Sequence, residues 1–207
     1  MKINLILLAA GYSKRFGDRK LLVPIDDKPL YEVTIDKLLQ LEKENEHRKL
    51  LVVTSYAEII DYCKEHAIDY VTNCGVQNTG IASSIKAALI HLMKTADRED
   101  NQPSCDVFFP ADQPFLDVFE VADFLEQFAS KQKNIGTMSC QGEWRTPNAF
   151  SEIYRKELLN LPPDKGGKYV MLGHKEDVFV YVSENEMQFF DIDTRKDYES
   201  IIDKHSS

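Results

Sequence analysis

The segment from Gly11 to Lys20 has the composition of a phosphate-binding loop. It contains two glycines, one serine and four basic residues: Gly11, Gly17, Ser13, Lys14, Arg15, Arg19 and Lys20. Glycines let backbone N–H groups approach phosphate oxygens, and Lys and Arg add charge-assisted hydrogen bonds. The loop contains neither the P-loop motif Gly-x-x-x-x-Gly-Lys-Ser/Thr nor the dinucleotide-binding motif Gly-x-Gly-x-x-Gly. A solvated basic loop is the alternative interpretation.

Acidic residues that suit a metal ion occur far from this loop in the sequence. Asp112 follows an apolar segment and lies in Ala111-Asp112-Gln113-Pro114. Mg²⁺ prefers few protein carboxylates together with phosphate oxygens and water. Taken alone, an aspartate before a proline is more often a turn residue than a metal ligand. Near the other end of the chain, strand alternation would place Asp191 and Asp193 on one face of a strand.

The elements that must position these residues alternate between strand and helix. The apolar run 3–10 predicts a strand covered on both faces. Further strands are expected at 50–54, 69–73 and 106–109, and helices at 30–41, 57–66, 81–92 and 118–128. This order predicts an α/β three-layer sandwich with a mostly parallel, Rossmann-like central sheet. Such sheets bind ligands beyond the carboxyl ends of their strands, where the loop from Gly11 to Lys20 would lie.

The second half of the chain has a different pattern. Shorter β-like segments at 135–139, 178–182 and 189–192 predict a mixed extension of the same sheet. Thr194 and Asp197 have the spacing of a capping box at the start of a final helix, 195–204. We expect a single domain over 1–207, whose pattern changes after about residue 114.

Charge and cysteine content narrow the possible functions. A formal net charge of -9 and a pI near 5.1 disfavour binding to nucleic acid or to an anionic membrane. The four cysteines are widely spaced and predict neither a zinc site nor a disulfide framework. The apolar run 3–10 is too short to cross a bilayer and has no signal-cleavage pattern, so a cytoplasmic location is predicted.

The loop also resembles a known signature. Leu-Ala-Ala-Gly-x-Ser-x-Arg-Phe-Gly-x-x-Lys-Leu, which begins at Leu8, closely resembles that of the nucleotidyltransferases related to molybdenum cofactor cytidylyltransferase. The resemblance implies a nucleotide-diphospho-sugar transferase-like fold. It also implies that the loop wraps a nucleoside triphosphate. The implied nucleotide-binding residues of this segment are Leu8, Ala9, Ala10, Gly11, Ser13, Arg15 and Lys20, with Arg15 and Lys20 on the phosphates.

Two acidic segments extend this resemblance. The segment around Asp112 resembles the family's metal-binding Asp-x-Pro, which implies that Asp112 is a Mg²⁺ ligand. The segment 191–197 resembles a closing Asp-Ile-Asp-Thr-Pro-Glu-Asp element, with Arg195 in place of proline. This resemblance implies that Asp193 is the second metal ligand, and Asp191 is the alternative candidate.

The base and the acceptor are less well defined by the sequence. Residues 78–85 resemble a family segment that faces the nucleobase, which implies roles for Gly80 and Ser84, and Asn73 resembles an asparagine after the third strand. The resemblance implies a nucleotide-binding half of about 1–114 and an acceptor-binding half of about 115–207, and the acceptor-binding half departs from the family pattern around Arg145 and Lys168. Either cation could meet an acceptor phosphate or be solvated.

These observations favour a Mg²⁺-dependent transferase with Arg15, Lys20 and Asp112 as catalytic residues. We expect transfer of CMP from CTP to molybdopterin, with a molybdoenzyme as a possible recipient of the product. The Ala-Ala-Gly spelling is that of the cytidylyltransferase branch. The alternatives are a related nucleotidyltransferase that uses another NTP or a sugar phosphate, and a non-catalytic nucleotide-binding chaperone of cofactor maturation.

Overall fold

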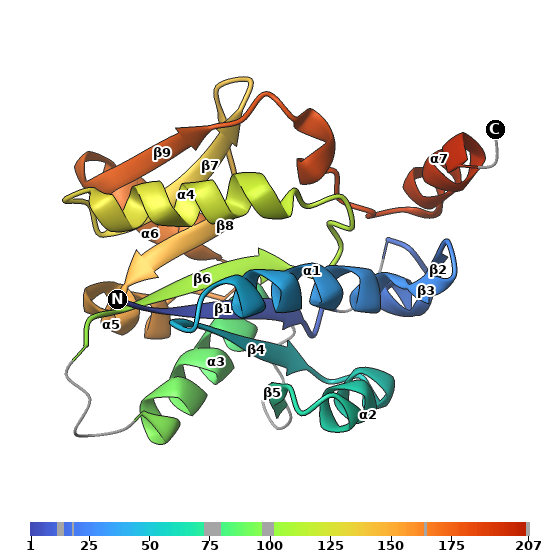
Figure 1. Cartoon of the computed structure of the whole chain (residues 1–207), viewed down its shortest axis with the longest axis horizontal. Helices are drawn as coiled ribbons and strands as arrows, with labels where there is room; N and C mark the ends of the chain where they lie inside the picture. The colour runs from blue at the N-terminus through green and yellow to red at the C-terminus, as the bar shows by residue number, and fades with distance from the viewer. Residues whose placement is uncertain (12–14, 18, 73–79, 97–101, 164, 206–207) are drawn as a thin grey trace.

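A seven-stranded sheet covered by helices on both faces forms the centre of the molecule (Figure 1). The computed structural model describes residues 1–11, 15–17, 19–72, 80–96, 102–163 and 165–205. The molecule is an α/β three-layer sandwich with a mostly parallel, Rossmann-like sheet, as the alternating pattern predicts.

The strands of this sheet run in the order β5-β4-β1-β6-β8-β7-β9. Their bounds are β1 Lys2–Ala9, β4 Arg48–Thr54, β5 Asp69–Thr72, β6 Ser104–Pro110, β7 Ile135–Cys140, β8 Glu143–Ser151 and β9 Val178–Val182. All neighbouring pairs are parallel except the two that involve β8, which is antiparallel to β6 and to β7. A separate hairpin pairs β2, Pro24–Ile25, with β3, Lys28–Pro29.

Helices form the two outer layers. The α-helices of the described residues are α1 Leu30–Glu44, α2 Ala57–Glu65, α3 Ile81–Thr95, α4 Val118–Ser130, α5 Arg155–Leu159, α6 Gly167–Gly173 and α7 Arg195–His205. Helices α1, α2 and α4 pack on one face of the sheet, and α3, α5 and α6 pack on the other. Four 3₁₀ turns complete the described elements: η1 Lys20–Leu22, η2 Glu152–Tyr154, η3 Lys175–Asp177 and η4 Glu186–Phe189. Among the described residues, no helix is both long enough and apolar enough to span a membrane.

Strand β1 lies at the centre because both of its faces are apolar. Leu5 and Leu7 belong to the core beneath α1 and α4, whereas Ile6 belongs to the core beneath α3, and all three are fully buried. Burying apolar side chains on both faces is what a central strand of a parallel sheet requires. The predicted strand 3–10 is therefore confirmed, with bounds shifted by one residue.

The chain order creates a switch point between β1 and β6. From β1 the chain proceeds to β4 and β5 on one side, and only then to β6 on the other side of β1. Connections that leave the carboxyl ends of β1 and β6 diverge there, and crevices of this kind bind ligands in open α/β sheets. The switch point brings the loop after β1 close to Asp112, which follows β6.

The second half extends the sheet as a mixed portion, as expected, but two details differ from the sequence analysis. The sequence did not identify β8, which joins β7 through a tight turn in which Gln141 has φ 53° and Gly142 has φ 78°. Positive φ at both positions is typical of a two-residue type I′ hairpin. The predicted β-like segment 189–192 is wrong: η4 ends at Phe189, and residues 190–193 belong to no strand.

Candidate functional site

The end of β1 is fixed from the neighbouring strand. The Thr54 hydroxyl donates a hydrogen bond to the Ala9 carbonyl over 3.1 Å, and the Tyr56 hydroxyl donates to the Gly11 carbonyl over 3.1 Å. Ala9 is fully buried, whereas Gly11 is exposed at the start of the loop. Leu8 and Ala10 are half-buried and pack against the core beneath α3. Ser13 lies outside the described residues.

Lys20 lies inside the site, on the 3₁₀ turn η1. Its side chain is only 10% exposed, and its Nζ lies 2.7 Å from Asp112 Oδ2 and 3.3 Å from Asp193 Oδ1. The next residue, Leu21, is buried in the core beneath α1, which anchors the turn. Lys20 is therefore not a solvated lysine: its charge compensates two carboxylates that are separated by 81 positions in the chain.

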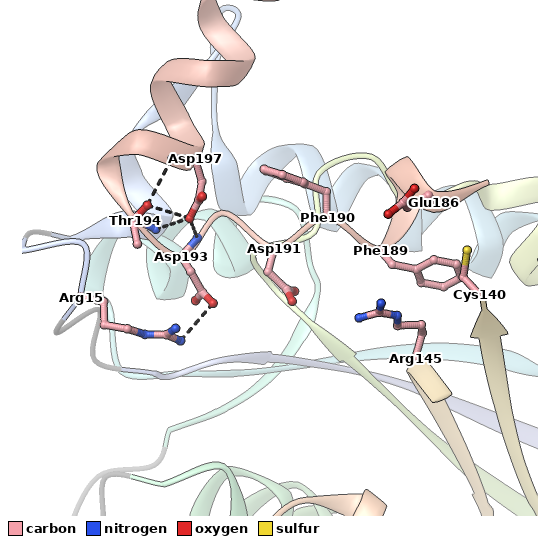
Figure 2. Close-up of a pocket in the computed structure, with 10 residues that line it drawn as sticks. All are labelled: Arg15, Cys140, Arg145, Glu186, Phe189, Phe190, Asp191, Asp193, Thr194 and Asp197. Atoms are coloured by element: carbon pink, nitrogen blue, oxygen red, sulfur yellow. Dashed lines mark hydrogen bonds and ion pairs between the residues drawn. The ribbon is translucent and has the colours of Figure 1, made fainter. Parts of the chain in front are cut away.

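A main-chain hydrogen bond brings the two acidic segments together. The Ile192 N–H donates to the Asp112 carbonyl over 3.1 Å, and the Ile192 side chain is fully buried. This bond places Asp193 beside the end of β6. Arg15 approaches from the loop, and its Nη2 lies 3.0 Å from Asp193 Oδ2 (Figure 2). The structure thus gathers Arg15, Lys20, Asp112 and Asp193 at one place.

Asp191 is held by a chain of side-chain hydrogen bonds that runs into the second half of the sheet. Gln113 Nε2 donates to Asp191 Oδ1 over 2.9 Å, and the Thr146 hydroxyl donates to Gln113 Oε1 over 2.9 Å. Burial, followed by repulsion from the Asp112 carboxylate, raises the pKa of Asp191 to about 6, although the Gln113 hydrogen bond acts in the opposite direction. Asp191 therefore takes up a proton more readily than an ordinary solvated aspartate.

A pocket of about 390 Å³ opens beside these acids (Figure 2). Its walls come from the loop after β1, the β7–β8 hairpin and the segment from η4 to α7. The lining residues are Arg15, Cys140, Arg145, Glu186, Phe189, Phe190, Asp191, Asp193, Thr194 and Asp197. Asp191 and Asp193 both line it, although no strand alternation places them there. Lys20 lies next to the pocket through its contact with Asp193, and Asp112 through its contact with Lys20, but neither is among the lining residues.

Comparison with known sequences identifies the family. Residues 5–178 match the MobA-like NTP transferase domain. The chain belongs to this family. A curated relative, the probable molybdenum cofactor guanylyltransferase of Peptoclostridium acidaminophilum, is 28% identical over an alignment of 198 residues that covers 91% of this chain and 79% of the relative. As a member of the family, the chain is a nucleotidyltransferase.

Solved structures share the fold. The Rv0371c protein of Mycobacterium tuberculosis is 20% identical, with a TM-score of 0.77 over 98% of each chain. A second structure of that protein, in complex with manganese, has a TM-score of 0.73 at 19% identity, over 98% of this chain and 99% of the other. The CTP complex of CMP:2-keto-3-deoxy-manno-octonic acid synthetase has a TM-score of 0.73 at 11% identity, over 100% of this chain and 99% of the other.

The segment that the sequence analysis assigned to the nucleobase lies at the start of α3. Gly80 precedes the helix, and its carbonyl accepts hydrogen bonds from the backbone N–H and hydroxyl of Ser83. Ser84 is buried at 5% exposure on the face of α3 that packs on the sheet. Neither Gly80 nor Ser84 lines the pocket. Asn73, which the sequence placed in the same subsite, lies outside the described residues.

The acidic residues suit the Mg²⁺ that the family resemblance implies. Asp112 and Asp193 offer hard oxygen ligands, and both already approach one positive charge, the Lys20 ammonium. No cluster of three His, Cys, Asp or Glu side chains arranged for a metal occurs within the described ranges. Two carboxylates completed by phosphate oxygens and water match the preference of Mg²⁺ for few protein ligands.

Several residues in and around the pocket were not singled out by the sequence analysis as site residues. Gln113 donates a hydrogen bond to Asp191, Thr146 donates one to Gln113, and Phe189 and Cys140 form part of the pocket wall. The position of Gln113 beside Asp112 was the available signal. Cys140 was interpreted only as a structural thiol, and it is free and buried here. The disposition of these residues depends on β8, which the sequence did not reveal.

Proposed function

We propose that this transferase moves a nucleoside monophosphate from an NTP to the phosphate of molybdopterin and releases pyrophosphate, in the cytoplasm. The observation that carries the proposal is the position of Lys20 Nζ between Asp112 and Asp193, directly after a loop with the family's spelling. The name of the curated relative supports a molybdopterin-type acceptor.

Each residue of the cluster has a role that follows from its place. The backbone from Leu8 to Gly11 and the Arg15 and Lys20 side chains would hold the triphosphate by charge-assisted hydrogen bonds. Asp112 and Asp193 would hold Mg²⁺, which when bound neutralises charge on the phosphates. Arg15 is 73% exposed, so it can turn from Asp193 to a phosphate. Positioning and charge stabilisation dominate phosphoryl-type transfer, so the cluster needs no nucleophilic side chain.

CTP is the proposed nucleotide because the loop has the Ala-Ala-Gly spelling of the cytidylyltransferase branch. GTP is the second candidate, favoured by the relative's name as a guanylyltransferase. We expect a higher kcat/KM for CTP, and we expect Ala10→Gly to reduce that preference by widening the space beside the loop. Equal kcat/KM for the two nucleotides, or a preference for GTP, would assign the chain to the guanylyl branch.

A pyrophosphate-release assay tests the proposal. Purified protein is incubated with Mg²⁺ and each NTP in turn, with and without molybdopterin. We expect release that depends on molybdopterin and falls on the order of a hundredfold or more in Asp112→Ala, because several kcal/mol of transition-state stabilisation are lost.

Asp61→Ala is the matched control for this assay. Asp61 is an exposed acid of α2 that pairs with Lys64 at 3.0 Å, away from the site. Its substitution should leave turnover unchanged. A folded Asp112→Ala protein with normal activity would remove Asp112 from the mechanism, and NTP binding without release for any acceptor would favour the non-catalytic alternative.

A further inference from the structure

The pocket has a cationic residue at the end opposite the triphosphate loop. Arg145 extends from β8, and Figure 2 shows its guanidinium directed across the pocket toward Asp191. Its Nε is buried and has no hydrogen-bond partner. Its ion-pair partner in the described structure is Glu143, at 2.9 Å between Nη2 and Oε2. A buried N–H without an acceptor costs free energy, so this group is a donor available to a ligand.

The backbone that carries Arg145 is fixed. The Thr137 hydroxyl donates to the Arg145 carbonyl over 2.8 Å and also lies 2.9 Å from Asn148 Oδ1. This contact occurs where the β7–β8 register shifts, between Thr137 and Met138. The Arg145 side chain therefore starts from an ordered position on the sheet and does not depend on a loop.

The contact with Glu143 does not prevent Arg145 from binding a ligand. The Glu143 side chain is 69% exposed, and exposed ion pairs contribute little free energy because water and salt screen them. A guanidinium presents its donors in a planar fork that matches two oxygens of a phosphate. A phosphate in the pocket would satisfy the buried Nε and could use the Nη groups as well.

We infer that Arg145 binds the phosphate of the acceptor and sets the specificity of the pocket for phosphorylated over dephosphorylated acceptors. This inference rests on the proposed function. Arg15 and Lys20 serve the triphosphate at the other end, so a second anion site here belongs to the attacking group. In the step it serves, an acceptor phosphate oxygen bonds to the α-phosphorus, the bond from that phosphorus to the β-phosphate oxygen breaks, and pyrophosphate leaves with the electron pair.

Two measurements test this role. The first is equilibrium binding, without NTP, of molybdopterin and of phosphatase-treated molybdopterin to the unmodified protein and to Arg145→Gln. The second is the KM for molybdopterin and for the NTP in the pyrophosphate assay. We expect Arg145→Gln to weaken binding of the phosphorylated form at least tenfold, to leave the dephosphorylated form unaffected, and to raise the KM for molybdopterin with the KM for NTP unchanged.

Two further variants separate this role from loss of fold or of net charge. Arg145→Lys keeps the charge but loses the fork and should recover only part of the affinity. Lys156→Gln removes one positive charge from an exposed position of α5 and should bind as the unmodified protein does. Thermal unfolding shows whether Arg145→Gln is folded, and if it is not, Arg145→Lys carries the test.

The outcomes distinguish the inference from the proposed function. Turnover in the unmodified protein with equal acceptor affinity in Arg145→Gln would overturn the role of Arg145 alone. Equal weakening for both forms of the acceptor would make Arg145 a wall residue with no phosphate contact, and a raised KM for NTP would assign it to the triphosphate. Absence of turnover with every acceptor would defeat the proposed function, whereas the binding comparison would still decide whether Arg145 recognises phosphate.

Discussion

Lys20 neutralises a concentration of negative charge that the fold itself creates. Asp112, Asp191 and Asp193 converge because a main-chain hydrogen bond joins their segments, and the pKa of Asp191 is raised by burial and by its two neighbours. The Lys20 ammonium contacts two of the three carboxylates. Neighbouring carboxylates repel one another and destabilise the folded chain unless a cation lies among them. Lys20 thus has a structural role in addition to the proposed phosphate contact.

Lys20→Met tests both roles of this side chain. The substitution keeps the aliphatic stem and removes the charge, so the protein should fold but lose about 1–3 kcal/mol of stability in metal-free buffer. We expect a Tm lower by roughly 2–4 °C per kcal/mol, and a larger Tm gain on adding Mg²⁺ than in the unmodified protein. Affinity for the triphosphate should fall at least tenfold, or about 1.4 kcal/mol, with a much smaller loss for free cytidine.

Lys28→Met is the control for the same change of side chain. Lys28 pairs with Asp36 on the surface, and its side chain is 52% exposed. Its substitution should change neither the Mg²⁺ dependence of Tm nor triphosphate binding. A Mg²⁺-induced gain in Tm that is the same in Lys20→Met as in the unmodified protein would show that the metal does not bind at these carboxylates.

The sequence predicted the charged centre of the site but not its supporting residues. Lys20, Asp112 and Asp193 belong to short sequence motifs that resemble those of the family, so each could be singled out from its neighbours in the chain. Gln113 and Thr146 are polar residues of ordinary type, and their contribution arises only when β8 lies beside β6. No short sequence motif predicts that β8 pairs with β6.

At the scale of elements, apolar periodicity predicted the strands whose two faces are covered and missed the one whose sequence is polar. Strand β8 reads Glu-Trp-Arg-Thr-Pro-Asn-Ala-Phe-Ser and contains Pro147, which argues against an internal strand. It is nevertheless inserted between β6 and β7, and Ala149 and Phe150 are fully buried. At 189–192, Phe189 and Ile192 are buried and Phe190 is half-buried, but the Ile192 N–H bonds to the Asp112 carbonyl after β6 without forming a strand.

Gly136 tests how closely α4 packs on β7. A Cβ at this position would lie 2.9 Å from Phe128 Cδ2 and 3.1 Å from Phe124 Cζ. Both rings are buried among neighbouring aromatic side chains and cannot move away easily. Gly136→Ala should therefore lower the free energy of unfolding by about 1–3 kcal/mol, measured by denaturant titration.

Gly173→Ala is the matched control, because a Cβ there would meet nothing within 4 Å. Its stability should equal or slightly exceed that of the unmodified protein, since alanine favours the end of α6 more than glycine does. A Gly136→Ala protein as stable as this control would show that the aromatic layer yields without cost.

At the scale of the whole molecule, resistance to acid depends on carboxylates that join distant segments. Asp177 accepts hydrogen bonds from the Asn134 backbone N–H, the Asn134 side chain and the Tyr154 hydroxyl, over 2.8 to 3.3 Å. Burial would raise the pKa of Asp177, but these hydrogen bonds outweigh it and hold the pKa below its ordinary value. The ionised form is therefore the form that stabilises the fold.

The sign of the pH dependence follows from this shift. A carboxyl whose pKa is lower in the folded state contributes stability above its unfolded pKa, and the contribution is lost as pH falls through its folded pKa. We expect Asp177→Asn to lower the unfolding free energy by about 1–2 kcal/mol at pH 7 and to make its decline below about pH 5 shallower. Asp61→Asn, at an exposed acid, is the control, and identical pH profiles for the two variants would refute the role of Asp177.

The bond from the Ile192 N–H to the Asp112 carbonyl also bears on how such a site can diversify. The last strand of the sheet ends at Val182, and the family match ends at residue 178. The segment that carries Asp191 and Asp193 therefore follows the sheet in the chain and contacts it from outside. This contact is a hydrogen bond between backbone groups, and every residue except proline can supply the N–H at position 192. Substitution of the side chains at 112, 191 and 193 would therefore leave this backbone contact in place, so the proposed metal and phosphate contacts can change while the geometry of the site is kept.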